Sequence, residues 1–158
     1  MNALKLLMED HVSVEALFER YWTTQSLWGK EELAIALVKA LSAQIELEDK
    51  VVILPLLKRS PSLASQVHRY LEAQNLIKAV IKGVGIPVPP SNANEREQRL
   101  DAKVQALFDR YQPCVELEEK ELFPQLQTVI GLEELERLGE ELEEARRRRA
   151  AQGPSAQE

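Results

Sequence analysis

The chain has 158 residues, of which 44% are hydrophobic and 29% are charged, and its formal net charge at pH 7 is −6. This length fits a single domain with a hydrophobic core. The negative charge argues against a nucleic-acid-binding protein, which would carry a basic patch. A single cysteine excludes an internal disulfide. The apolar run at the N-terminus is too short for a signal peptide or a membrane span, so we expect a cytoplasmic protein.

Apolar residues recur at helical spacing along most of the chain, and no long stretch alternates with the period of two that is typical of strands. The first predicted helix carries an apolar stripe from Leu4 to Phe18 and ends near residues 22–24. The second predicted helix begins near residues 30–32. Pro55 should kink or end this second helix, because proline lacks the N–H of an intrahelical hydrogen bond and crowds the preceding turn.

The sequence Ser60-Pro61-Ser62 predicts a break in the chain, with serine available as the N-cap of the next helix. The third predicted helix follows, with an apolar stripe from residue 67 to residue 81. Residues 85–97 are rich in proline and small polar residues, and they predict the one long connection. The fourth predicted helix begins its apolar stripe at residue 100 and meets a proline at residue 124.

Gly131 opens a short amphipathic C-terminal helix that completes a predicted domain of residues 1–148. The polar residues 149–158 predict a disordered tail. The arginine run at residues 146–149 is interpreted as cations that offset a helix dipole. Four helices of about 20 residues with mostly short links predict an all-α fold, an antiparallel up-down four-helix bundle with a short C-terminal helix.

Each predicted helix places polar side chains on its apolar stripe. They are His11 in the first helix, Gln44 and Glu48 in the second, Gln74 in the third, and Cys114 and Glu118 in the fourth. Unpaired buried carboxylates cost several kcal/mol, so these must be protonated, hydrated, paired with a cation or bound to a metal ion. Lys78 is the nearest candidate cation, and His68 lies on a different helix face and is predicted to be exposed.

Two interpretations of this cluster stay open. Two carboxylates, an imidazole and a thiolate that converge inside a helical bundle can form a metal site. Alternatively, Gln44 and Gln74 can hydrogen-bond Glu48 and Glu118 in a closed network without a metal. In that second interpretation Cys114 is a small buried hydrophobe.

The segment LKLLMEDHVSVEALFERY, residues 4–21, resembles the first helix of the hemerythrin-like, or HHE cation-binding, domain family. The acidic clusters followed by proline, at residues 48–55 and 118–124, resemble that family as well. So do RLDAKVQALFDRY, residues 99–111, and GLEELERLGEELEEAR, residues 131–146. QIELEDK, residues 44–50, and CVELEEK, residues 114–120, are also similar to each other, so the second and fourth helices look like related halves.

Members of this family hold two bridged non-haem iron ions with histidines and carboxylates from all four helices. They bind or sense oxygen, handle nitric oxide or peroxide, or serve in iron storage and repair. The resemblance implies that His11 is the first-helix ligand and Glu118 the fourth-helix carboxylate. It implies Glu48 as the second-helix carboxylate, with Asp49 as the other candidate.

Three residues depart from the family pattern. Gln44, Gln74 and Cys114 stand where the resemblance predicts histidines. Glutamine offers a metal ion only a neutral oxygen, and a di-iron centre that binds oxygen reversibly needs more than one imidazole. We therefore do not expect an oxygen carrier.

Three functional hypotheses follow. In the first, His11, Glu48 and Glu118 hold one iron or zinc ion, with Cys114 as a candidate fourth ligand, in a sensing or stress role. In the second, the chain is a metal-free scaffold or partner-binding protein, with the region around Trp28 or the closing helix as its partner surface and a homodimer as one option. In the third, it is an enzyme with a modified centre, although the sequence shows no nucleophile–base pair or phosphate loop.

Overall fold

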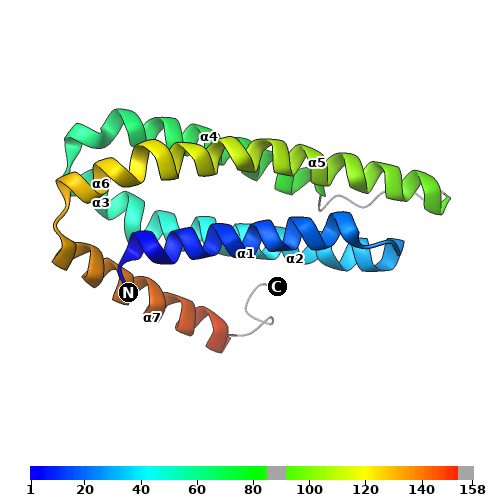
Figure 1. Ribbon diagram of the computed structural model, residues 1–158, viewed down its shortest axis with the longest axis horizontal. Coiled ribbons are helices and arrows are strands. Elements are labelled where there is room, and N and C mark those ends of the chain that lie inside the picture. The colour runs from blue at the N-terminus through cyan, green and yellow to red at the C-terminus, as the bar shows by residue number, and fades with distance from the viewer. Residues whose placement is uncertain (85–91, 153–158) are drawn as a thin grey trace.

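The computed structural model describes residues 1–84 and 92–152, and all elements in these residues are helical, which confirms the predicted all-α class. The long helices are α1 (Ala3–Thr23), α2 (Leu27–Glu48), α4 (Ala64–Val84), α5 (Ala93–Leu117) and α7 (Leu132–Gln152). The short ones are η1 (Asp49–Ile53), α3 (Leu54–Arg59), η2 (Pro61–Leu63), η3 (Glu118–Leu122) and α6 (Phe123–Val129). Figure 1 shows the long helices α1, α2, α4 and α5 lying side by side.

Side-chain caps determine where three of the long helices begin. Asn2, Ser26 and Asn92 each accept a hydrogen bond from the backbone N–H three residues later. Each bond satisfies a donor that has no partner inside the helix. The predicted starts of the second and fourth helices were therefore too late. Residues 93–97 of the predicted connection are helical, and residues 85–91 lie outside the described residues.

Pro55 and Pro124 do not end their helices, so of the two outcomes predicted at Pro55, a kink or an end of the helix, the end does not occur. Each proline follows a π-helical turn, η1 or η3, and helical residues continue beyond it in α3 or α6. In each π turn a backbone N–H donates to the carbonyl five residues earlier. The wider turn opens the hydrogen-bond ladder where the proline has no N–H to contribute.

The predicted break at residues 60–62 is confirmed, since α3 ends at Arg59 and the 3-10 turn η2 leads into α4. Ser60 stands at the N-cap position of η2, in agreement with the predicted serine cap, but its side chain makes no capping hydrogen bond. Instead, the backbone carbonyl of Ser60 accepts a hydrogen bond of 3.0 Å from the backbone N–H of Leu63.

One hydrophobic core lies between the long helices. α1 packs against α2, α4 packs against α5, and α2 contacts both α4 and α5. Aromatic rings connect α1 to α5: Phe18 meets Phe108 edge-on with ring centroids 5.1 Å apart, and Tyr111 lies 5.6 Å from Phe18. Near the far end of α1, the hydroxyl of Tyr21 donates a 2.7 Å hydrogen bond to Asp101.

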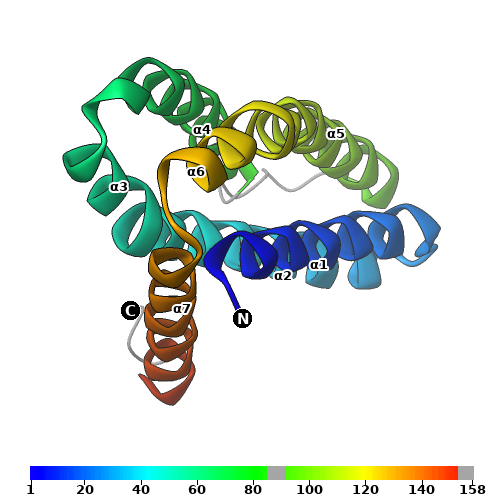
Figure 2. The ribbon, with the colours of Figure 1, turned by 60° about the vertical axis from the view of Figure 1, so that its left-hand side comes forward.

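The C-terminal helix α7 diverges steeply from the other helices (Figure 2) and packs against α1. With 21 residues it is as long as α1, so the prediction of a short helix is wrong. Its buried side chains include Leu135, Leu138 and Leu142. At Gly139 the N-terminus of the chain comes so close that an added Cβ would collide with the backbone carbonyl oxygen of Met1.

Helix α7 runs to Gln152, four residues into the segment predicted as a tail, and residues 153–158 lie outside the described residues. Within residues 1–84 and 92–152, none of the helices combines the length and the apolar content needed to cross a membrane.

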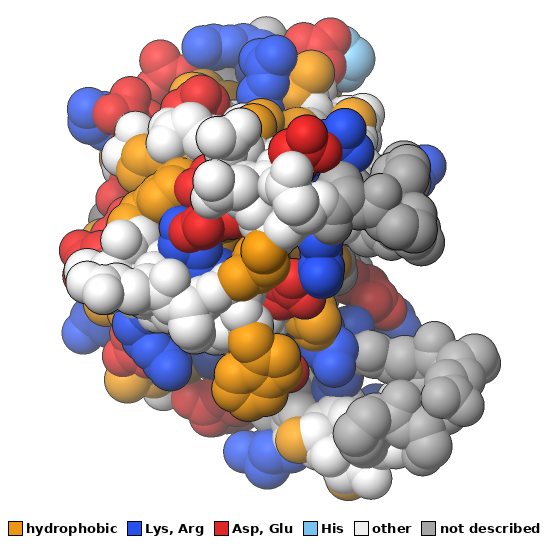
Figure 3. Space-filling view, turned by 90° about the vertical axis from the view of Figure 1, so that its right-hand side faces the viewer, with side chains coloured by type: hydrophobic (Ala, Val, Ile, Leu, Met, Phe, Trp, Pro, Cys, Tyr) orange, Lys and Arg blue, Asp and Glu red, His pale blue; other side chains and the backbone are white. Residues whose placement is uncertain are grey.

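Figure 3 shows the end of the molecule at which α1 ends and α2 begins. There acidic and basic side chains are interspersed, with hydrophobic side chains reaching the surface between them. The side chain of Trp28 is 73% exposed, and the second hypothesis proposes the region around it as a partner surface.

Candidate polar site in the helical core

The six polar residues predicted for the helical stripes come together in the interior. A small cavity offers about 10 Å³ to the centre of a water molecule, which is room for about one water or one ion. Five of the six residues line this cavity, and His11 contacts one of them, Glu118. The five lining residues are Gln44, Glu48, Gln74, Cys114 and Glu118. All of the six except Gln44, which is half-buried, are buried.

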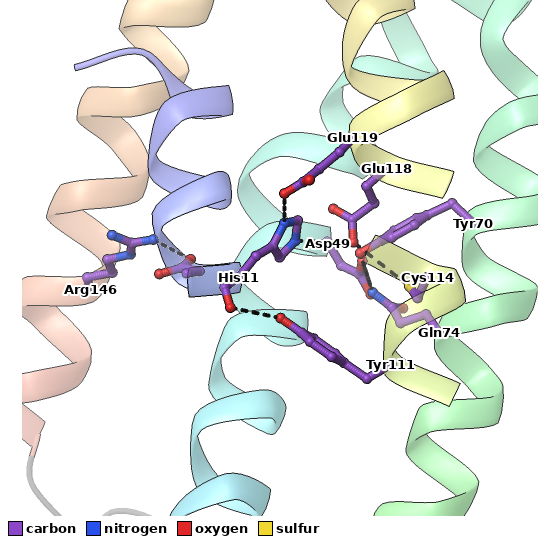
Figure 4. Close-up of polar contacts among 10 residues, drawn as sticks. His11, Asp49, Tyr70, Gln74, Tyr111, Cys114, Glu118, Glu119 and Arg146 are labelled. Atoms are coloured by element: carbon purple, nitrogen blue, oxygen red, sulfur yellow. Dashed lines mark hydrogen bonds and ion pairs between the residues drawn. The ribbon is translucent and has the colours of Figure 1, made fainter. Parts of the chain in front are cut away.

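His11 reaches the site from α1 and is held on one side by a carboxylate (Figure 4). Its Nδ1 lies 2.8 Å from Oε1 of Glu119, and its Nε2 lies 3.6 Å from Oε1 of Glu118. The imidazole ring stacks parallel to Phe123, and the hydroxyl of Tyr111 donates to the backbone carbonyl of His11. A histidine that is held through one ring nitrogen and leaves the other without a hydrogen-bond partner in the described residues has the arrangement of a metal-binding histidine.

Glu48 and Glu118 form a buried carboxyl pair, and their side chains hydrogen-bond each other. Burial raises the pKa of Glu48 well above its usual range, and the neighbouring charge of Glu118 raises it further. Burial also raises the pKa of Glu118, to about 7, although the hydrogen bonds from Glu48 and Cys114 counteract part of this rise. Burial and the proximity of the two carboxyl groups therefore favour a pair that retains a proton.

Cys114 is a neutral thiol in this arrangement. Its Sγ lies 3.8 Å from Oε1 of Glu118 and donates a weak hydrogen bond. Burial raises the pKa of the thiol, and the charges of Glu118 and Glu48 raise it further. A thiolate at this position, as the first hypothesis requires for a fourth ligand, needs a cation beside it.

Gln74 is held by two hydrogen bonds from its amide nitrogen. Nε2 donates to Oδ1 of Asp49 at 2.8 Å and to the hydroxyl of Tyr70 at 2.9 Å. Asp49 also faces Lys78, whose Nζ lies 3.9 Å away. The predicted cation Lys78 therefore pairs with Asp49 and not with the buried carboxyl pair. The predicted exposure of His68 is confirmed, since its side chain is 74% exposed.

Glu119, Tyr70 and Tyr111 were not among the predicted site residues, and Asp49 was predicted only as an alternative to Glu48. The spacing of Tyr70 from Gln74, four residues on one helix, could have revealed it. Glu119 and Asp49 could not be found from α-helical spacing, because each lies in a π-helical turn. The extra residue in such a turn lets two neighbouring side chains face the interior.

Five buried polar atoms of the site have no hydrogen-bond partner within the described part of the chain. They are Nε2 of His11, Oε1 of Gln44, Oε1 of Glu48, Oε1 of Gln74 and Oε2 of Glu118. Nearly all buried polar atoms in folded proteins have a partner. This cluster of unpaired atoms therefore marks the cavity as a place that suits a polar occupant.

The side chains do not fit the two-iron centre that the family resemblance implies. One imidazole is present, and the amide of Gln74 is already bound to Asp49 and Tyr70. In residues 1–84 and 92–152, no three His, Cys, Asp or Glu side chains are arranged so that together they could hold a metal ion. Binding of even one ion thus requires the carboxyl pair to release its proton and rearrange.

Comparison of the chain with protein-family models, with curated proteins and with solved structures finds no match. The hemerythrin-like resemblance stays a prediction that rests on the residues quoted above.

Proposed function

We propose that the chain is a hemerythrin-like four-helix bundle, formed by α1, α2, α4 and α5, whose core binds a single iron or zinc ion. Two features support the bundle assignment. Polar residues stand on the inner face of each of these four helices. In addition, both acidic segments with a following proline contain a π-helical turn beside the cavity.

The observation that carries the metal proposal is the set of unpaired donor atoms on three side chains. Nε2 of His11, Oε1 of Glu48 and Oε2 of Glu118 are each buried without a hydrogen-bond partner among the described residues, and Nε2 of His11 lies 3.6 Å from Oε1 of Glu118. After loss of the shared proton, the two carboxylates would neutralise the charge of a divalent ion. An imidazole with two carboxylates is a donor set that suits zinc or iron.

Metal binding at this site is coupled to proton release, because the carboxyl pair holds a proton at neutral pH. Metal affinity should therefore rise with pH through the range in which Glu118 titrates, around 7. A bound cation would also favour the thiolate of Cys114, which the neighbouring carboxylates otherwise disfavour. Such a site is suited to sensing metal or oxidant, as in the first hypothesis from the sequence.

A metal-free scaffold is the second candidate function, and a specific observation favours it. No group of three ligand side chains is preformed in the described residues, and the carboxyl pair is already stabilised by its own hydrogen bond. In that case the polar core is a protonated network, and the function lies in a partner surface, such as the region around Trp28.

Elemental analysis of untagged protein, purified without chelators, separates the two candidates. The metal proposal predicts about one iron or zinc ion per chain in the unsubstituted protein and in His68→Ala, which alters an exposed histidine. His11→Ala should lose the ion. Zinc at about 100 times its Kd should also stabilise the unsubstituted protein by about 2.7 kcal/mol. Absence of metal, together with an unchanged melting temperature after addition of zinc or iron, would leave the scaffold.

A further inference from the structure

A groove on the surface of the molecule is far larger than the core cavity. It lies between the C-terminal half of α2, with η1 and α3, and the C-terminal half of α4, and its volume is about 810 Å³. Pockets that bind small molecules have volumes of about 300–1,000 Å³. None of the polar side chains that line the core cavity lines this groove.

The groove is cationic although the chain as a whole is acidic. Five cations and two acids line it, which gives an excess of three positive charges against the net charge of −6 for the whole chain. The cations are Lys50, Lys58, Arg59, Lys78 and Lys82, and the acids are Glu46 and Asp49. Such a local reversal of charge favours an anionic ligand.

Much of this positive charge is not neutralised by neighbouring side chains. Arg59 pairs with a glutamate of α7, and Lys78 faces Asp49. Lys50, Lys58 and Lys82 form no ion pair with any residue in the described ranges. The acid Glu46 is held from outside the groove by an arginine of α7, at 2.9 Å. Three lysines are thus available to an anion.

The groove also has an apolar lining. This lining is formed by Ile45, Leu54, Pro55 and Ile81, and Leu54 is 47% exposed although it is a large hydrophobic residue. A groove lined by both apolar side chains and cations is complementary to a molecule that has an alkyl chain and an anionic head group, because the chain can contact the apolar side chains and the head group the cations.

We propose that this groove binds a small amphipathic anion with a single alkyl chain and a phosphate head group. Three available ammonium groups suit a phosphate, which carries close to two negative charges, better than a singly charged carboxylate. The bounded, concave shape suits a single molecule in solution. The proposal does not depend on a metal in the core.

Isothermal titration calorimetry of the full chain can test this with four probes, kept below the concentrations at which they form micelles. Octyl phosphate should bind more tightly than octanoate, and octanoate more tightly than octanol. Inorganic phosphate, which lacks the chain, should bind more weakly than octyl phosphate. The affinity for octyl phosphate should fall with added salt, because the head group is held by exposed charges.

Substitutions separate the charged and the apolar contributions. Lys58→Ala with Lys82→Ala should weaken octyl phosphate binding by roughly 2-fold to 30-fold, whereas Lys5→Ala with Lys39→Ala, outside the groove, should not. Leu54→Ser should weaken binding of octyl phosphate by roughly threefold and leave inorganic phosphate unaffected.

Two results would overturn the proposal. One is a titration in which octyl phosphate binds no more tightly than octanol, or binds the lysine variant with the same affinity as the unsubstituted protein. The other is a dimer in analytical ultracentrifugation that the Lys58→Ala and Lys82→Ala variant dissociates, without octyl phosphate binding; the groove would then hold the acidic helix α7 of a second copy. His11→Ala should still bind octyl phosphate, so a failure of the metal proposal is distinguishable from a failure here.

Discussion

Substitution of Glu118 by glutamine should flatten the dependence of stability on pH in the metal-free protein. In the unfolded chain Glu118 has its ordinary pKa of 4.5, and in the folded protein burial raises it to about 7. Between these two pH values the folded protein keeps a proton that the unfolded chain has released. The part of the free energy of unfolding that depends on protonated Glu118 is therefore fully present below pH 4.5 and is lost as the pH rises through 7.

The size of this effect follows from the two pKa values. A rise from 4.5 to about 7, at about 1.4 kcal/mol per pH unit, corresponds to roughly 3 kcal/mol. That is a large part of a total stability of about 5–15 kcal/mol. The raised pKa of Glu48 acts in the same direction. Glutamine at position 118 removes the ionisable group but keeps a polar side chain of similar shape.

Urea unfolding in a chelator at pH 5, 6, 7 and 8 measures the effect. The unsubstituted protein should lose stability across this range, and Glu118→Gln should lose clearly less. Glu116→Gln, which alters a largely exposed carboxylate two residues earlier in the chain, should keep the slope of the unsubstituted protein. If the unsubstituted protein is more stable at pH 7 than at pH 5, or if Glu118→Gln retains the full slope, the buried proton does not exist.

Three further predictions concern packing and the polar network, and urea unfolding measures each of them. Gly139→Ala should cost about 1–3 kcal/mol, because an added Cβ would collide with the first residue, whereas Gly83→Ala, with open space around it, should be neutral or stabilising. Leu138→Ala should cost about 2–5 kcal/mol because Leu138 is fully buried; a cost as small as that of Leu132→Ala, at a 63% exposed position, would show that α7 does not dock. Gln74→Leu should cost about 1–3 kcal/mol, since two oxygen atoms lose their donor, and an unchanged stability would contradict the network.

The helices were predictable because their apolar stripes are long and regular. The stripe from Leu4 to Phe18 lies in the core, as its spacing indicates. The starts of α2 and α5 were predicted late, since the capping residues Ser26 and Asn92 precede the apolar stripes by several residues. The length of α7 was underestimated because the arginine-rich segment is too polar to show a stripe, yet arginine is a good helix former.

The composition of the site was predictable for the same reason, but its chemistry was not. Buried positions on a helical stripe can be read from spacing, and the six predicted residues do converge. Protonation depends on distances between side chains of different helices. The hydrogen bond between Glu48 and Glu118, and the neutral thiol of Cys114 beside them, follow from that proximity.

The two acidic segments show how one sequence pattern gives the site its layout. In each segment the first acid, Glu48 or Glu118, faces the cavity. The second acid instead holds a polar side chain from a neighbouring helix: Glu119 binds His11, and Asp49 binds Gln74. The π-helical turns make this division possible, because an α-helical turn would direct two consecutive side chains about 100° apart. Glu48 is therefore the acid that lines the cavity, and Asp49 acts in the site by binding Gln74.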